Sequence, residues 1–509
     1  MDFQANTCPV FIETTLFDQT AENPFDLDVH LPEYYPDVQR ILKCGVRPNI
    51  QSVSVSGDRI VVEGSGTLRM LYAAEDQTIV AFEQNVPISR TLHSPVDLAG
   101  ASVCADGRED FVNCRASGQR RVSVHGVISL RVRAFGREEL SIVCGSESDA
   151  LQMKTSPVRT LSLTGMGERV FAMSEVVELG SEDPSIEKLL RADAALRVDS
   201  TKAVKDKLLV KGEAVVEWTY LPTEGNAPQR IRHSMPVSQI LETTGVSEDD
   251  AQDVTLAVQE LLLTPKPDGS GEARLVDVAL RIRAHVRTGK LIQADAVTDL
   301  YATRGDLRTT WTDMELITPL ETIRDSMSVR QTIELPGAGV SRILDAGADE
   351  VLVDVRTGED GVEAACTASL SVLYLDTDGE PMVADTKADF LYSRHTPTQT
   401  GEIRCAMQVQ IASCKASLAD GSAEVQIEAV VSGTVYAVET RRLLRAVQLL
   451  DAQEEESPAA LTIYFADEGE SVWDVARRYR TTTQAILEEN DLTEDVIPDK
   501  RMLVIPCGA

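Results

Sequence analysis

The 509-residue sequence contains no apolar run that approaches the roughly 20 residues of a membrane span. Its first 39 residues include eight Asp and Glu but no Lys or Arg, so the basic segment that begins a secretory signal is missing. We therefore expect a cytoplasmic protein that does not insert into a membrane.

Cysteine is scarce, and the nine cysteines include no Cys-x-x-Cys pair. An odd number without that spacing favours reduced thiols in a reducing compartment over a disulfide framework. We expect Cys366 to be a small buried hydrophobic residue, because glycine holds the corresponding position in two related segments described below.

Basic residues are also in short supply, since 49 Lys and Arg stand against 81 Asp and Glu, a formal net charge of −32. Such a chain repels the phosphates of nucleic acids and the headgroups of anionic lipids. Nucleic acid and membrane surfaces are therefore poor candidates for partners, and basic or neutral partners fit better.

Catalytic motifs are missing as well. No Ser/His/Asp or Cys/His set recurs along the chain, and no Gly-x-Ser-x-Gly nucleophile elbow occurs. Gly165 and Gly167 lack the third glycine and the helix of a phosphate-binding loop. The sequence predicts a protein that is not an enzyme and has no cofactor, with a hydrolase site confined to one part of the chain as an alternative.

Metal-binding patterns are incomplete. The six histidines show no metal-ligand spacing, and His125 and His285 fall on the polar faces of predicted strands, so we expect solvated surface residues. Asp376, Asp378 and Gly379 form a fragment of a calcium loop without its later ligands. A hairpin turn explains that fragment better, and no metal site is predicted.

What the chain does have is a threefold repeat. A segment resembling Arg-Ile-Leu ends 22 positions before a small residue, and a tyrosine follows that residue after eight more positions. The landmarks are Leu42, Gly64 and Tyr72; Leu190, Gly212 and Tyr220; and Leu344, Cys366 and Tyr374. A period of about 150 residues indicates domain-sized repeats, because solenoid units span only about 20 to 50 residues.

Each repeat contains two long segments in which apolar and polar residues alternate, as in antiparallel strands with one solvated face. We predict a mainly β chain of three tandem antiparallel β-sandwich-like domains at 1–150, 151–307 and 308–451. The Arg-Ile-Leu segments are predicted to form short helices that plug one end of each domain.

The last part of the chain follows a different pattern. Residues 443–451 are predicted to form a short exit helix, and 452–459 an acidic linker. From 460 to 509 the predicted order is strand, helix, helix, strand. Ser471 is expected to cap the first of these helices, and Asn490 suits the left-handed end of the second.

This C-terminal segment resembles a LysM domain, through the runs 469–476, 490–492 and 503–506. The resemblance implies a groove between the first β-α loop and the loop after the second helix, which in LysM domains typically binds glycans containing N-acetylglucosamine. Whether the groove binds a glycan or a protein stays open. The candidate binding residues are Gly469, Glu470, Ser471, Val472, Trp473, Asn490, Asp491, Leu492 and Ile497.

Trp473 has two interpretations. Its ring could stack on a sugar or on a side chain of a partner, but its place between two core residues of the predicted helix favours packing within the protein.

The three repeats resemble the SPOCS domains of endospore-forming bacteria, and their pairing with a terminal LysM domain is similar to a spore-coat morphogenetic family of clostridia. That resemblance implies a scaffold in the mother-cell cytoplasm, at the forespore surface, whose LysM domain docks on the coat-basement morphogenetic ATPase. The β domains would bind other coat proteins or further copies of the chain through strand edges. The alternative is a peptidoglycan-binding protein of the cell wall or spore cortex.

Overall fold

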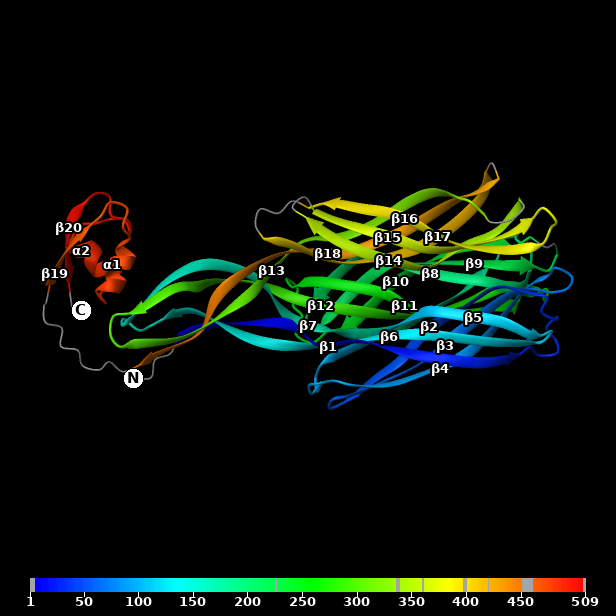
Figure 1. Cartoon of the computed structure of the whole chain (residues 1–509), viewed down its shortest axis with the longest axis horizontal. Helices are drawn as coiled ribbons and strands as arrows, with labels where there is room; N and C mark the ends of the chain where they lie inside the picture. Colours follow the sequence, from blue (N-terminus) through cyan, green and yellow to red (C-terminus); the bar gives the residue numbers. More distant parts are fainter. Residues whose placement is uncertain are drawn as a thin grey trace.

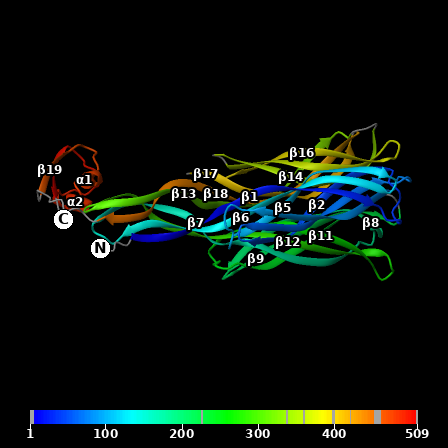
Figure 2. The same cartoon turned by 60° about the horizontal axis from the view of Figure 1, so that its bottom comes forward.

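The computed structural model describes residues 5–224, 227–335, 339–358, 361–396, 401–419, 421–450 and 461–506. Its strands form an elongated body that narrows into a stalk, and a small module with two helices lies at the far end of the stalk (Figure 1, Figure 2). The mainly β fold class is therefore confirmed. Neither helix in the described residues is long and apolar enough to cross a membrane.

The body consists of three units with one topology, each with a long and a short three-stranded antiparallel sheet. The long sheets have the orders β1-β6-β5, β7-β12-β11 and β13-β18-β17, and the short sheets β2-β3-β4, β8-β9-β10 and β14-β15-β16. The strands of the first unit are β1 (Ala5–His30), β2 (Arg40–Ser56), β3 (Arg59–Ala73), β4 (Ile79–His93), β5 (Ser102–Gly118) and β6 (Arg121–Ser146).

The second and third units repeat this order. The second contains β7 (Leu151–Glu178), β8 (Ile186–Val204), β9 (Lys207–Pro222), β10 (Gln229–Glu242), β11 (Ala251–Pro267) and β12 (Ala273–Ala302). The third contains β13 (Asp306–Ile333), β14 (Val340–Gly358), β15 (Gly361–Asp376), β16 (Pro381–His395), β17 (Glu402–Ala419) and β18 (Ser422–Leu450).

Alternation along the central strands builds one core per unit. In β6, Val122, Val124 and Ile128 have no exposed surface, and the equivalent inward residues of β12 and β18 are buried in the same way. Each unit thus encloses its own apolar cluster between its two sheets. This arrangement confirms the predicted strand alternation, because every second side chain of a strand faces the same side.

The leucine of each Arg-Ile-Leu segment lies at a β-bulge, where the pairing register shifts by one residue. Leu42, Leu190 and Leu344 meet in a single apolar cluster that joins the three units. The prediction of short helices at these segments is wrong, because they belong to β2, β8 and β14. The bulge interrupts the alternation of apolar residues. Because the segment therefore lacks the clear alternation of a strand, its sequence favours a helix.

In the first two units, the tyrosine landmark ties a loop to the central strand of the short sheet. The hydroxyl groups of Tyr72 and Tyr220 donate to the carbonyl oxygens of Pro36 and Pro184, both at 2.9 Å. Burial raises the pKa of Tyr72 to about 12, so the hydroxyl stays a donor at neutral pH. The two matching hydrogen bonds explain why the spacing of the landmarks is kept.

The stalk consists of the outer ends of the six longest strands, paired as the ribbons β1/β6, β7/β12 and β13/β18. Apolar side chains from all three ribbons form two further clusters. The predicted exit helix over 443–451 is wrong, since β18 continues to Leu450. Leu443 and Leu444 are buried in different clusters, so adjacent apolar residues here do not indicate a helix.

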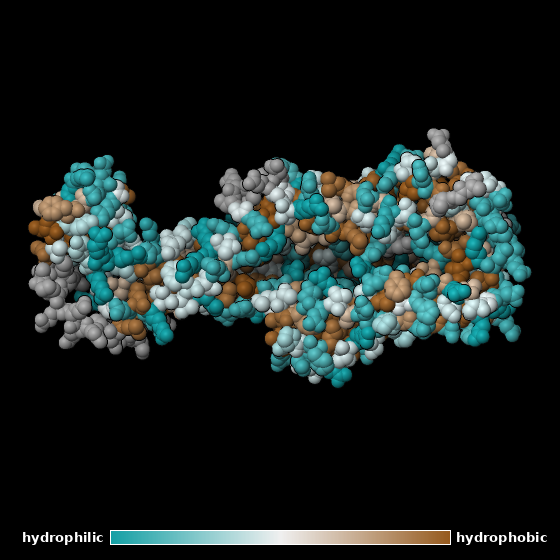
Figure 3. Space-filling view, viewed as in Figure 1, coloured by the Kyte–Doolittle hydropathy of each residue, from teal (hydrophilic) through white to brown (hydrophobic). Residues whose placement is uncertain are grey.

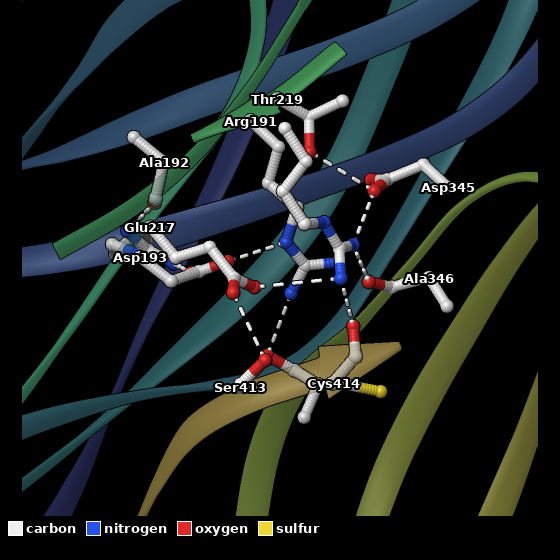
Figure 4. A network of polar contacts seen from close by, with 12 residues as sticks. Arg191, Ala192, Asp193, Glu217, Thr219, Asp345, Ala346, Ser413 and Cys414 are labelled. Atoms are coloured by element: carbon white, nitrogen blue, oxygen red, sulfur yellow. Dashed lines mark hydrogen bonds and ion pairs between the residues drawn. The ribbon is translucent and has the colours of Figure 1, made fainter. Parts of the chain in front are cut away.

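Buried charges join the second unit to the third. The Arg230 guanidinium donates to a carboxylate oxygen of Asp345 at 2.5 Å and to the carbonyls of Ala346 and Cys414, both at 2.6 Å (Figure 4). The Glu217 carboxylate lies 3.5 Å from the same guanidinium. The Glu217 side chain is only 11% exposed, and this burial raises its pKa.

A second charge cluster next to it includes the first unit. Arg47 donates to Asp193 at 2.7 Å, and Arg191 contacts the same carboxylate. Burial alone would raise the pKa of Asp193, but the two guanidinium groups hold it well below its ordinary value. A Cβ at Gly347 would overlap the Arg191 guanidinium, so any other residue at this position would force the Arg191 side chain to move.

The cysteines are not all reduced. Cys44 of β2 and Cys114 of β5 form a disulfide between the two sheets of the first unit, which corrects the expectation from the cysteine count. Their separation of 70 residues follows no short motif, so sequence spacing could not reveal the pair. Cys366 is buried as predicted.

His285 is not a solvated surface residue as predicted. Its ring lies 6.4 Å from that of Phe135 in the first unit, and burial, with positive charge from Arg287, lowers its pKa to about 4. The polar face of β12 meets the neighbouring unit here instead of solvent. In contrast, the predicted hairpin turn at 376–379 is confirmed, since it joins β15 to β16.

The C-terminal module contains β19 (Leu461–Ala466), α1 (Val472–Arg478), α2 (Thr483–Glu489) and β20 (Arg501–Pro506). The predicted order of strand, helix, helix, strand is confirmed. The helices cover one face of the β19–β20 sheet and enclose a small core with it. The predicted linker at 452–459 lies outside the described residues.

Candidate binding site in the C-terminal module

The two loops expected to form the groove are bonded to each other through their backbones. Gly469, in the left-handed region at φ 83°, donates its N–H to the Ile497 carbonyl at 2.8 Å, and the Ile497 N–H donates to the Glu470 carbonyl at 2.9 Å. Val472 N–H donates to the Asp495 carbonyl at 2.9 Å. The loops therefore have a fixed geometry, and much of their backbone hydrogen-bonding capacity is used internally.

Three of the candidate residues serve the structure of the module. Val472 and Ile497 have no exposed surface. The Asn490 side-chain amide donates to the carbonyls of Ile486 and Val504 at 2.8 Å and accepts from the Val504 N–H at 2.7 Å. These contacts fasten the end of α2 to β20. They leave these side chains little capacity to bind a ligand.

The left-handed residue at the end of α2 is Asp491, at φ 49°, and not Asn490 as predicted. Asn490 is the C-cap with φ −111°, because its side chain is engaged with β20. Asp491 tolerates this conformation better than most residues other than glycine.

Four of the other candidates are at least partly accessible. Gly469 and Asp491 are exposed, and Ser471 and Leu492 are half-buried. Ser471 caps α1, since its hydroxyl accepts the Trp473 N–H at 3.2 Å. The structure therefore places these residues around the paired loops, with few polar side chains free to recognise a sugar.

Glu470 is half-buried and engaged. Its carboxylate accepts from the Tyr464 hydroxyl at 2.6 Å, and this hydrogen bond is the main cause of the raised pKa of Tyr464.

Trp473 faces the stalk. Only 8% of the residue is exposed, its ring packs edge-on against Tyr301 with centroids 4.9 Å apart, and its indole N–H donates to Asp299 at 2.9 Å. Both partners lie in β12, more than 170 residues earlier in the chain. Sequence reasoning missed them, because no local pattern links a strand end to a distant helix.

An exposed apolar surface lies on the other side of the module. Every second residue of β19 faces solvent there, with exposed fractions of 56% for Leu461, 60% for Ile463 and 77% for Phe465. Met502, paired with Phe465 across the sheet, is 55% exposed. We call these four residues the outer sheet face; hydrophobic colour is visible at this end of the module (Figure 3).

The alternation of Leu461, Ile463 and Phe465 is visible in the sequence. Alternation alone does not show which face of a strand is buried, so the sequence could not identify the outer sheet face as solvent-exposed.

No cluster of three or more His, Cys, Asp or Glu residues in the described part of the chain is arranged to hold a metal ion.

Comparison with protein families places two kinds of domain in the chain. A family model described as SipL, SPOCS domain matches residues 37–116 and 185–264, and a LysM domain model matches residues 467–506. No curated protein and no solved structure matches the chain. The SPOCS matches cover β2 to β5 and β8 to β11 almost entirely.

The matched domains indicate a sporulation-related protein, and both are non-catalytic binding domains. Along the chain, two segments thus resemble SPOCS domains and the last segment resembles a LysM domain.

Proposed function

We propose that the protein is a non-catalytic scaffold of spore-envelope assembly whose LysM domain docks on the coat-basement morphogenetic ATPase. In this proposal it works in the mother-cell cytoplasm, at the forespore surface, and links coat layers to the forespore. The domains are SPOCS-like units at 1–150, 151–307 and 308–451, a linker at 452–459 and the LysM domain at 460–509. The third unit counts as SPOCS-like because it shares the sheet orders of the two matched units.

The outer sheet face is the observation that supports a protein partner. Contiguous exposed apolar side chains on a soluble domain mark an interaction surface, because their burial in a complex removes apolar area from water. Phe465 at 77% exposure is the natural anchor, since aromatic residues are enriched at the centres of protein interfaces.

The groove supports a glycan less well. Sugar binding needs polar groups that can exchange water for hydroxyl groups, usually with an aromatic ring for stacking. Here the Asn490 amide and the Glu470 carboxylate are hydrogen-bonded within the domain, and the Trp473 ring lies against Tyr301.

The test is capture of the purified ATPase by the full chain with the double substitution Ile463→Ser and Phe465→Ser. We expect the affinity to fall by about tenfold or more, as for loss of a central apolar anchor. Leu391→Ser is the matched control, because Leu391 is 56% exposed on the body. Undiminished capture by the double variant would exclude the outer sheet face as the docking surface.

The LysM match also favours a second candidate, binding to peptidoglycan of the cortex or wall. Gly469, Asp491 and the 50% exposed Val496 border the paired loops and would contact the glycan. Sedimentation with purified peptidoglycan separates the two candidates. Pelleting that the double variant retains and that competing N-acetylglucosamine oligomers abolish would support the glycan function.

A further inference from the structure

The LysM domain packs against the tip of the stalk, and we call this contact the seat. Asp299 and Tyr301 lie two residues apart near the end of β12, so they face the same side, just after a register shift at Thr298. One oxygen of Asp299 accepts from the indole of Trp473, and the other pairs with Arg477. The carboxylate thus binds two side chains of α1 at once.

Further contacts surround this pair. The Tyr301 hydroxyl donates to the carbonyl of Thr481 at 2.8 Å, a buried hydrogen bond. Arg480 pairs with Asp306 at 3.2 Å. Lys154 lies 4.0 Å from Asp495 in the second groove loop. The last two pairs are at least 46% exposed on each side, so the aromatic contact and the bonds to Asp299 and Tyr301 contribute most of the specificity.

The order of the layers in the LysM domain determines which of its surfaces the seat leaves exposed. The stalk contacts α1, and α1 packs against the inner face of the β19–β20 sheet. The outer sheet face is on the opposite side of that sheet. Figure 1 and Figure 2 both show α1 nearer the stalk and β19 at the far end of the molecule.

We propose that the stalk tip is a receptor for the LysM domain that presents the outer sheet face at the distal end of the molecule. Trp473 is then a positioning residue that binds the stalk, and Asp299 and Tyr301 are its receptor. The role in presentation rests on the proposed function, whereas the seat itself does not.

Presentation raises affinity by fixing the orientation before the partner arrives. A domain held in one orientation loses less rotational freedom on binding than a tethered domain that tumbles.

The experiment uses the full chain with Asp299→Asn, Tyr301→Phe or Trp473→Phe, and Asp313→Asn as the control. Asp313 is exposed on β13, away from the contacts described above. Tyr301→Phe keeps the ring and removes one hydrogen bond, whereas Trp473→Phe keeps an aromatic side chain but loses the indole N–H and part of the packed ring. Amide hydrogen exchange is measured by mass spectrometry in peptides covering 299–306 and 473–481.

We expect faster exchange in these two regions for the three variants, on the order of tenfold for Asp299→Asn because two charge-assisted contacts are weakened. Capture of the ATPase should weaken several-fold. Unchanged exchange would overturn the seat. If exchange changed while capture of the ATPase stayed the same or became tighter, the contact between stalk and LysM domain would not promote binding. The proposed presentation of the outer sheet face would then be refuted. No capture by the unsubstituted chain would refute the proposed function, while exchange still decides whether the seat exists.

Discussion

Two junctions of this molecule use charged side chains in opposite ways. Between the second and third units, the side chains of Arg230, Asp345 and Glu217 are 20%, 10% and 11% exposed. At the stalk tip, Arg480 and Asp306 are 54% and 76% exposed. The first junction depends on every buried charge being paired, whereas the second can open with its charges returning to water.

The apolar contacts differ in the same direction. The three units share the cluster around Leu42, Leu190 and Leu344, and their strands share two more clusters in the stalk. Among the described residues, Tyr301 alone joins the LysM core from the body. We therefore expect the body to unfold as one cooperative block and the LysM domain as a separate one.

The largest effect should come from Arg230→Ala. The substitution leaves the carboxylates of Asp345 and Glu217 buried without their partner, and breaking a buried pair in this way destabilises by about 3–5 kcal/mol. Chemical denaturation of the body measures the change in the free energy of unfolding.

Arg356→Ala is the control for this prediction. Arg356 and its partner Asp354 are 74% and 67% exposed, so their loss should change stability by less than about 1 kcal/mol. Equal effects of the two substitutions would show that burial does not distinguish the junctions.

The second prediction concerns pH at the junction of the first and second units. The pKa of His285 is about 4, lowered by burial and then by Arg287, Arg133 and Arg283, against Asp106. Glu168 is its cross-strand neighbour.

Below pH 6.5 the unfolded chain binds a proton at His285 that the folded chain rejects until about pH 4, so acidification destabilises the body. The shift corresponds to about 3 kcal/mol lost between pH 7 and 4. His285→Gln should remove the part of the pH dependence that comes from His285. The difference between the denaturation midpoints of the unsubstituted and substituted chains, measured at several pH values, gives this part. His125→Gln, which removes an exposed histidine, is the control variant.

The sequence predicts those features of the fold that depend on local residue patterns. Alternation identified the inward faces of β3, β6 and their repeats, and capping residues located α1 and α2. It failed at bulges, where Leu42 and its counterparts change face without a sequence signal, and at the end of β18. A local pattern records which side chains share a face of one element, but not which element will cover that face.

The same limit of local sequence patterns applies to the candidate binding site. The two loops that the sequence predicts to border a groove are paired through their backbones, but the sequence could not distinguish the core residues Val472 and Ile497 from accessible neighbours. The sequence favours packing for Trp473, and the structure shows it packed. Its partners Asp299 and Tyr301 can be identified only from the contact between the stalk and the LysM domain.

The smallest effect should come from Asn490→Ala, which tests whether the LysM domain unfolds independently. The alanine removes two hydrogen bonds to Val504 of β20 and one to Ile486 of α2, a loss of about 2 kcal/mol because one backbone group is left less well paired. In differential scanning calorimetry the transition of the LysM domain should move to lower temperature while that of the body stays in place. Gln484→Ala, on the exposed side of α2, is the control. If both transitions moved together, the stalk seat would be strong enough to couple the domain to the body, and the contrast between the two junctions would disappear.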